Sequence, residues 1–188
     1  MGSVYAVANQ KGGVGKTTTA VNIAACAAQG GDQVLICDLD SQCNATVALG
    51  LGRELRPSSY ECLMGERSVA EAARPAGPDN LWIVPANRDL AGASIELPRI
   101  EGSERTLRET LGPVRERFAL TLLDCPPALG PVTVNAQVLS VLHSFNGTDG
   151  QFAESALVQG SDGNFYGTTV LGGANHLGTV FKSIRQGT

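Results

Sequence analysis

Apolar runs alternate with helical patterns over the first two thirds of the chain. Runs that suit β-strands occupy residues 4–9, 33–40, 81–86 and 119–124. The first of them, VYAVAN, is almost continuously apolar, which is typical of a parallel strand that is buried on both faces. We therefore predict four strands, with helical or irregular connections between them.

Two of the connections have clear helical patterns. Residues 17–29 are rich in alanine and precede Gly30 and Gly31, which are typical of a helix C-terminus. Residues 103–118 begin with Ser103 as a possible N-cap. Their apolar residues, three or four positions apart on one face, are Leu107, Leu111, Val114 and Phe118. Strands that alternate with helices predict an α/β fold in which helices flank a mostly parallel sheet.

A different pattern begins near residue 139. Residues 140–188 hold nine glycines but only five charged residues, and short apolar runs are separated by turn signals. Asn146-Gly147, Asp149-Gly150 and Asp162-Gly163 are pairs typical of β-hairpin turns. We predict an α/β domain over residues 1–138 and a Gly-rich tail of β-hairpins over residues 139–188.

The composition excludes several classes of protein. Of the 188 residues, 43% are hydrophobic and 17% are charged, so the chain can bury a core. Its net charge of −4 is unlike that of a protein whose whole surface binds nucleic acid. No apolar run approaches the roughly 18 residues of a membrane span, and the N-terminus does not resemble a secretory signal. We expect a cytoplasmic protein that does not bind membranes.

The five cysteines indicate neither a disulfide framework nor a zinc site, because their number is odd and no CxxC occurs. We predict that Cys26, in the Ala-rich helix, and Cys37, in a strand, belong to the core. Cys125 follows the fourth strand, where a small packing residue is the preferred interpretation and a reactive thiol the alternative.

The strongest chemical signal lies between the first strand and the first helix. It reads Lys11-Gly12-Gly13-Val14-Gly15-Lys16-Thr17-Thr18. Glycines let backbone N–H groups converge on a phosphate chain, and the helix that follows contributes the positive end of its dipole. Lys16 can reach the β- and γ-phosphates, and the Thr17 hydroxyl can bind Mg²⁺. The pattern predicts a nucleotide-phosphate site; a glycine turn before an ordinary helix is the alternative.

One departure from the usual phosphate loop is informative. Gln10 stands where the usual first glycine would be, and Lys11 adds a second lysine in a chain with only three. The segment KGGVGKTTT resembles the deviant Walker A box of the ParA/MinD ATPases. Further matches follow in the family's order, at residues 38–46, 87–93, 122–127 and 133–136. The resemblance covers residues 3–138, and the Gln-x-Asn-Ala-Thr run favours the ParA-type partition ATPases.

The resemblance implies roles in binding phosphate. Lys16 and the amides of Gly13, Val14 and Gly15 would hold the β- and γ-phosphates, and Thr18 would contact the α-phosphate. Gly12 belongs to the same loop. Lys11 would reach across an ATP-dependent homodimer to the partner's phosphates and neutralise charge on the transferred group.

The resemblance also implies that one part of the site binds magnesium. This part would consist of Thr17, Asp38, Asp40 and Asp124. Thr17 would bind the ion, and Asp124 would hold a Mg²⁺-bound water. Asp40 would orient the attacking water, and Asp38 would support the site from its strand end. Solvated turn residues are the alternative for Asp38 and Asp40.

Two residues depart from the family's switch segment. Ser41 replaces a proline and Cys43 replaces a glycine. Cys43 does not adopt a positive φ as readily as glycine, so we expect altered switch geometry and altered hydrolysis.

The resemblance implies an ATPase that binds and hydrolyses Mg-ATP in chromosome or plasmid partitioning, with a ParB-like partner and non-specific DNA. The tail instead resembles one unit of the Gly-rich, propeller-like repeats of secreted or surface proteins. Because the tail stands where the second half of the ParA fold is expected, we expect weakened DNA binding and impaired hydrolysis. We also expect the first strand to become a sheet edge if the tail does not cover it. The alternative is a truncated or chimeric chain without ATPase activity, which acts as a β-repeat interaction or structural protein.

Overall fold

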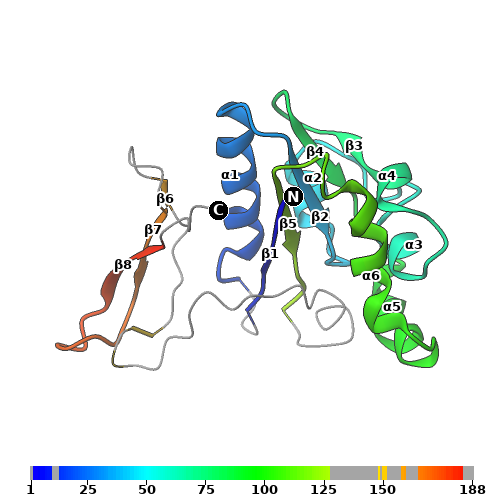
Figure 1. Cartoon of the computed structure of the whole chain (residues 1–188). Helices are drawn as coiled ribbons and strands as arrows, with labels where there is room; N and C mark the ends of the chain where they lie inside the picture. Colours follow the sequence, from blue (N-terminus) through cyan, green and yellow to red (C-terminus); the bar gives the residue numbers. More distant parts are fainter. Residues whose placement is uncertain are drawn as a thin grey trace. The chain divides into compact units, whose positions relative to one another are not determined.

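The computed structural model describes residues 2–9, 13–127, 148, 150–151, 158–159 and 165–183 (Figure 1). The chain divides into two compact units. The first comprises Met1–Gly12 and Lys16–Leu139, and the second comprises Gly13–Gly15 and Ser140–Thr188. The domain boundary predicted after residue 138 falls outside the described residues and stays a prediction. Within the described ranges, no helix is long and apolar enough to cross a bilayer.

The first unit is built on a five-stranded sheet with the order β1-β5-β2-β4-β3. Its strands are β1 (Ser3–Val7), β2 (Val34–Asp38), β3 (Arg74–Pro75), β4 (Leu81–Val84) and β5 (Leu120–Asp124). β1, β5, β2 and β4 run parallel, whereas β3 pairs antiparallel with β4. The four parallel strands lie where the apolar runs predict them. β3 has only two residues, too few for a recognisable pattern.

Helices cover both faces of this sheet, with α1 on one face and α3, α5 and α6 on the other (Figure 1). The α-helices are α1 (Lys16–Gln29), α2 (Asn44–Ala48), α3 (Ser59–Leu63), α4 (Val69–Ala72), α5 (Leu90–Glu96) and α6 (Ser103–Leu111). Two 3-10 turns, η1 (Leu97–Arg99) and η2 (Gly112–Val114), follow α5 and α6. The predicted fold class, a mostly parallel sheet flanked by helices, is confirmed.

Small residues let α1 lie close to the sheet. Ala20, Ala24 and Ala28 recur every four residues, so they form one stripe along the helix, and all three are buried. The opposite face of the sheet packs against larger side chains such as Leu107 and Leu111 of α6. Burying one such leucine stabilises the fold by about 1.5 to 3 kcal/mol.

β1 differs from its prediction as a strand buried on both faces. It is the outermost strand of the described sheet and pairs only with β5 there. Ser3 and Tyr5 are exposed, and the strand's other residues are half-buried. An apolar run indicates burial on average, but it does not say which strand lies at the edge of a sheet.

The predicted helix at residues 103–118 is shorter in the structure. α6 ends at Leu111 because Pro113 has no backbone N–H, and the chain continues as the 3-10 turn η2. Ser103 does not cap the helix either. Gly102 is the N-cap residue, and the Ser103 hydroxyl donates to the carbonyl oxygen of Leu97 at 2.6 Å.

The second unit contains a three-stranded antiparallel sheet in the order β6-β7-β8. Its strands are β6 (Val158–Gln159), β7 (Phe165–Thr169) and β8 (Thr179–Ser183). Gly178, which precedes β8, has φ +87°, and a Cβ there would lie 2.2 Å from the carbonyl oxygen of Thr169. The three predicted turn pairs are not fully described, and neither is the segment at residues 133–136. The resemblance of this unit to a propeller repeat is unconfirmed.

The segment after β2 carries local backbone strain. Cys43 precedes α2 and has φ 57° and ψ 34°, the left-handed conformation that non-glycine residues seldom adopt. Its side chain is buried, and its thiol donates to the carbonyl oxygen of Ser41 at 3.3 Å. Position 43 therefore has the positive φ expected from the family's glycine.

Substitution of two buried cysteines by valine tests this strain. Cys37 lies in β2, whose extended backbone suits a β-branched side chain, whereas Cys43 has a left-handed backbone that does not. We expect Cys43→Val to lower the free energy of unfolding by about 1 to 2 kcal/mol more than Cys37→Val. Urea unfolding of both variants measures the difference, and equal losses would contradict a strained Cys43.

Candidate active site

The predicted phosphate loop enters α1 through two glycines with a left-handed backbone. Gly13 has φ 73° and Gly15 has φ 80°, so both positions favour glycine. α1 then begins at Lys16, with Thr17 and Thr18 in its first turn and no acidic residue there. The N-terminus of this 14-residue helix therefore suits an anion. Gln10, Lys11 and Gly12 lie outside the described residues, so their predicted roles stay predictions.

Strand register brings two carboxyl groups together at the other side of the site. β2 and β5 pair in parallel with Asp38 opposite Asp124, and each residue is the last of its strand. Both side chains are buried, and Asp40, two residues beyond Asp38, is nearly buried. The parallel sheet thus places three acidic residues at the carboxyl ends of neighbouring strands, where the resemblance implies the magnesium-binding part of the site.

Both carboxylate oxygens of Asp38 accept hydrogen bonds from nearby residues of the chain. Its Oδ1 accepts a hydrogen bond from the backbone N–H of Asp40 at 3.1 Å. Its Oδ2 accepts from the backbone N–H of Thr46 at 2.9 Å and from the Thr46 hydroxyl at 2.7 Å. Burial raises the pKa of Asp38 to about 6, although the Thr46 hydrogen bonds oppose that shift. These contacts fit the supporting role predicted for Asp38.

Asp124 has the opposite environment. It is 1% exposed, yet neither of its carboxylate oxygens has a hydrogen-bond partner among the described residues. Burial raises its pKa to about 7, and the charges of Asp38 and Asp40 raise it further. The Thr17 hydroxyl and the Lys16 ammonium oppose this shift. The Thr17 hydroxyl lies near the carboxyl group without completing a hydrogen bond of ordinary geometry.

These neighbours show which predicted residues the structure brings together. Lys16 and Thr17 of α1 lie close enough to Asp124 to influence its charge, as do Asp38 and Asp40. A buried carboxylate without a partner is unfavourable unless a cation compensates it. The arrangement therefore fits a divalent cation beside Thr17 and Asp124.

Thr46 is a site residue whose contacts were not predicted. Besides its bonds to Asp38, its hydroxyl accepts a hydrogen bond from the backbone N–H of Ala86, just beyond β4, at 2.9 Å. Ser59 of α3 donates its hydroxyl to the carbonyl oxygen of Asp38 at 2.5 Å. Thr46 belongs to the Gln-x-Asn-Ala-Thr run, which was a usable signal, whereas no pattern singled out Ser59.

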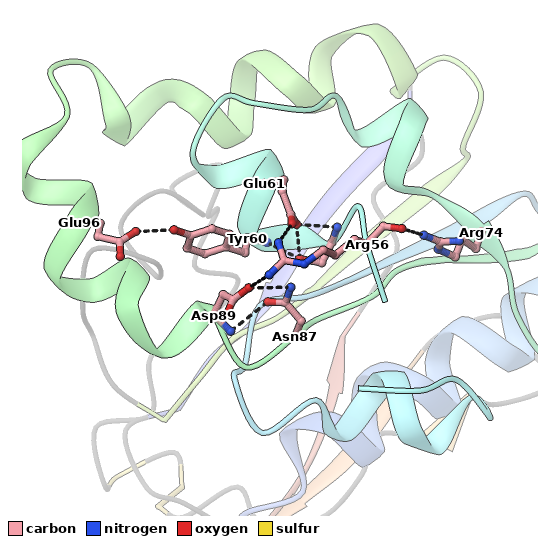
Figure 2. Close-up of polar contacts among 8 residues, drawn as sticks. Arg56, Tyr60, Glu61, Arg74, Asn87, Asp89 and Glu96 are labelled. Atoms are coloured by element: carbon pink, nitrogen blue, oxygen red, sulfur yellow. Dashed lines mark hydrogen bonds and ion pairs between the residues drawn. The ribbon is translucent and has the colours of Figure 1, made fainter. Parts of the chain in front are cut away.

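A second polar cluster holds the segment after α2 against the start of α5 (Figure 2). Arg56 forms ion pairs with Glu61 and Asp89, and Asp89 accepts from the side chain of Asn87 at 3.4 Å. A hydrogen bond from the Tyr60 hydroxyl to Glu96, at 2.6 Å, raises the pKa of Tyr60 to about 12.

A hollow of about 510 Å³ lies beside this cluster and contains none of the predicted phosphate-site residues. Its lining residues are Arg56, Pro57, Glu61, Glu66, Arg67 and Glu71. Asn87 and Asp89, from the segment at residues 87–93 that resembles the family, belong to the cluster that holds the Arg56 segment.

The cysteines follow their predictions with one exception. Cys37 and Cys125 are buried, and burial raises the pKa of Cys125 to about 12, so this thiol is a packing residue rather than a nucleophile. Cys26 is exposed, contrary to its prediction as a core residue, because it lies off the Ala20–Ala24–Ala28 stripe of α1.

Replacing Asp124 by asparagine tests the buried charge. The carboxyl is neutral in both states well below its usual pKa of 3.8, and it ionises first in the unfolded chain because its folded pKa is about 7. The folded state is therefore progressively destabilised between about pH 4 and pH 7. In urea unfolding without nucleotide, we expect Asp124→Asn to exceed the parent in stability by about 2 to 4 kcal/mol above pH 7.

At pH 3.5 to 4 the two proteins should be about equally stable. Asp79→Asn, at an exposed aspartate, is the matched control and should leave stability unchanged at every pH. A difference between Asp124→Asn and the parent that stays constant with pH would contradict a buried, unpaired carboxylate.

Comparison with known proteins places the chain in a family. A family model described as an AAA domain matches residues 2–142. The chain is 41% identical over 141 residues to the sporulation initiation inhibitor protein Soj of Bacillus subtilis, covering 74% of this chain and 56% of that protein. It is 44% identical over 136 residues to the chromosome partitioning protein ParA of Caulobacter vibrioides, covering 71% and 51%.

A solved structure is similar over the same region. It is cobyrinic acid a,c-diamide synthase from Mycobacterium smegmatis with bound ADP and magnesium. Its TM-score is 0.69 at 40% identity, covering 72% of this chain and 56% of that one. The chain spans about half the length of the curated relatives that it matches. Over residues 2–142 it belongs to the AAA domain family, as a member of the ParA-type partition ATPases.

Proposed function

We propose that the chain binds Mg-ATP at the N-terminus of α1 and hydrolyses it. The observation that carries this proposal is the buried, unpartnered carboxylate of Asp124 beside Lys16 and Thr17. A structural relative with bound ADP and magnesium supports the choice of nucleotide and metal. Membership of the partition ATPase family supports hydrolysis as the reaction.

The residues at the start of α1 would hold the triphosphate. The backbone amides of Gly13, Val14, Gly15 and Lys16, with the Lys16 ammonium, would neutralise the β- and γ-phosphates. The Thr18 hydroxyl would contact the α-phosphate. Lys11 would act from the partner subunit of an ATP-dependent homodimer, with Gly12 as part of the same loop.

The acidic residues would have separate roles in binding the cation and in orienting the attacking water. In the described part of the chain, no three His, Cys, Asp or Glu side chains are arranged to coordinate one ion. Mg²⁺ would therefore be held by the Thr17 hydroxyl, the phosphates and waters that Asp124 binds, and its charge would stabilise the leaving group. Asp40 would orient the attacking water, while Asp38 would hold the Asp40 backbone in place through the bond at 3.1 Å. Asp38 and Asp40 would add negative charge that favours the cation.

The cellular role would be chromosome or plasmid partitioning in the cytoplasm, with a ParB-like partner. Names of relatives such as the Caulobacter chromosome partitioning protein support this role. The alternative, an interaction or structural protein that works through its β-rich tail, predicts a folded chain that binds no nucleotide.

Lysine substitutions test the proposed site. The chain has three lysines, so Lys182→Ala, outside the phosphate loop, is a natural control for Lys11→Ala and Lys16→Ala. We expect Lys16→Ala to abolish Mg-ATP binding in calorimetry. Lys11→Ala should retain binding but lower the rate of phosphate release, because its charge acts on the transferred group. If the folded parent bound no nucleoside triphosphate, the proposal would be contradicted.

DNA binding should be weak. Sequence-independent binding needs a surface that neutralises several phosphates, and this chain has 14 basic against 18 acidic residues. On α6, Arg105 and Arg108 each have a glutamate next to them in the sequence, Glu104 and Glu109, and such mixed charge is typical of a solvated helix face. We expect fluorescence anisotropy with duplex DNA to show little binding at moderate salt, with or without ATP. ATP-dependent binding at micromolar concentration that falls steeply with salt would contradict this expectation.

A further inference from the structure

The hydroxyl group of Thr46 connects the ends of two strands of the sheet. Thr46 is the third residue of α2, and its side chain is fully buried. Its hydroxyl oxygen accepts the backbone N–H of Ala86 at 2.9 Å and lies 2.7 Å from Oδ2 of Asp38. Because the Ala86 N–H can only donate, the hydroxyl proton is directed to the Asp38 carboxylate. The direction of both hydrogen bonds is therefore fixed by the chemistry of the groups at their ends.

The other oxygen of the Asp38 carboxylate holds the backbone of Asp40. Oδ1 of Asp38 accepts the Asp40 N–H at 3.1 Å, and the Asp40 carbonyl oxygen accepts the N–H of Cys43 at 2.8 Å. Oδ1 of Asp40 accepts the N–H of Gln42 at 2.9 Å, whereas its Oδ2 has no donor among the described residues. Asp40 is thus fixed at its backbone and at one carboxylate oxygen, and its second oxygen can accept a hydrogen bond from water.

Thr46 is the one described residue whose side chain donates to the Asp38 carboxylate. Loss of this hydroxyl would leave the buried N–H of Ala86 without its acceptor, and it would leave Oδ2 of Asp38 with a single donor. A carboxylate held by fewer donors rotates more easily. The Asp40 N–H would then lose an acceptor of fixed position.

We propose that Thr46 is a positioning residue for hydrolysis: its hydroxyl fixes the Asp38 carboxylate and, through it, the Asp40 that would orient the attacking water. The part played in hydrolysis rests on the proposed function, whereas the hydrogen bonds that position Asp40 do not. Thr46 does not act on the nucleotide directly, because its side chain is fully buried and its hydroxyl proton is donated to Asp38. Its loss therefore affects the rate of hydrolysis and not the affinity for nucleotide.

Substitutions at Thr46 test this role in steady-state ATP hydrolysis. Thr46→Val keeps the shape of the side chain but removes the hydroxyl, so we expect kcat to fall at least about tenfold and KM to stay within about twofold of the parent. Thr46→Ser retains a hydroxyl and should keep most of kcat. Thr110→Val is the matched control and should change neither parameter, because the Thr110 hydroxyl donates within α6, to Thr106 at 3.0 Å.

Equal losses of kcat in Thr46→Val and Thr46→Ser, or a rise in KM with kcat unchanged, would overturn the proposal. If circular dichroism shows that Thr46→Val is misfolded, Thr46→Ala replaces it. A double-mutant cycle tests whether Thr46 acts through Asp38. Thr46→Val should lower kcat little further in a chain that already carries Asp38→Asn, whereas independent losses would contradict this route.

Hydrogen exchange without nucleotide separates this inference from the proposed function. In Thr46→Val, the Asp40 amide should exchange at least about tenfold faster than in the parent, and in Thr46→Ser it should match the parent. The amide of Ile36, inside β2, reports any loss of global stability. If the parent hydrolysed no ATP, the proposed function would be contradicted, and the exchange rates would still decide whether Thr46 positions Asp40. A rise at Asp40 that is absent, or no larger than the rise at Ile36, would overturn the inference.

Discussion

The pairing of β2 with β5 constrains everything else at the candidate site. Its register sets Asp38 opposite Asp124, so two carboxyl groups are buried side by side at the carboxyl ends of the central strands. Two such charges repel, and burial disfavours both. Hydrogen bonds from Thr46 and Asp40 stabilise one carboxylate, whereas the other is left without a partner among the described residues. This asymmetry makes the edge of the sheet suited to a cation.

The surrounding structure holds this pair in place. Thr46 joins Asp38 to the end of β4 through Ala86, and Ser59 anchors the carbonyl group of Asp38. Arg56, in the segment that follows α2, forms an ion pair with Asp89 at the start of α5 and so connects that segment to the helix (Figure 2). On the other face, the alanine stripe of α1 allows that helix to approach the sheet, so its first residues come near Asp124. Packing and chemistry therefore depend on the same elements.

Sequence patterns predicted the parallel strands and α1 because each has a local signature, whereas the roles of the acidic residues follow only from the family resemblance and stay predictions. The patterns did not fix the place of β1 in the sheet, and an edge position was expected only if the tail does not cover this strand, since strand order depends on contacts between distant segments. Gly112 and Pro113 indicate that α6 ends at Leu111, but the spacing of the apolar residues predicted a longer helix. The hydrogen bonds of Ser59 could not be predicted, because a serine in a short helix carries no sign of a partner 21 residues away.

Proton release tests most directly whether the buried carboxyl group of Asp124, which has no hydrogen-bond partner among the described residues, takes part in binding a cation. At pH 6.5 a carboxyl with a pKa of about 7 is mostly protonated, and Mg²⁺ near it should displace that proton. Calorimetric titration of Mg-ATP in buffers of different ionisation enthalpy measures the protons released. We predict that the parent releases about half a proton or more beyond the Asp124→Asn variant. Equal release by both proteins, with binding intact, would contradict the claim.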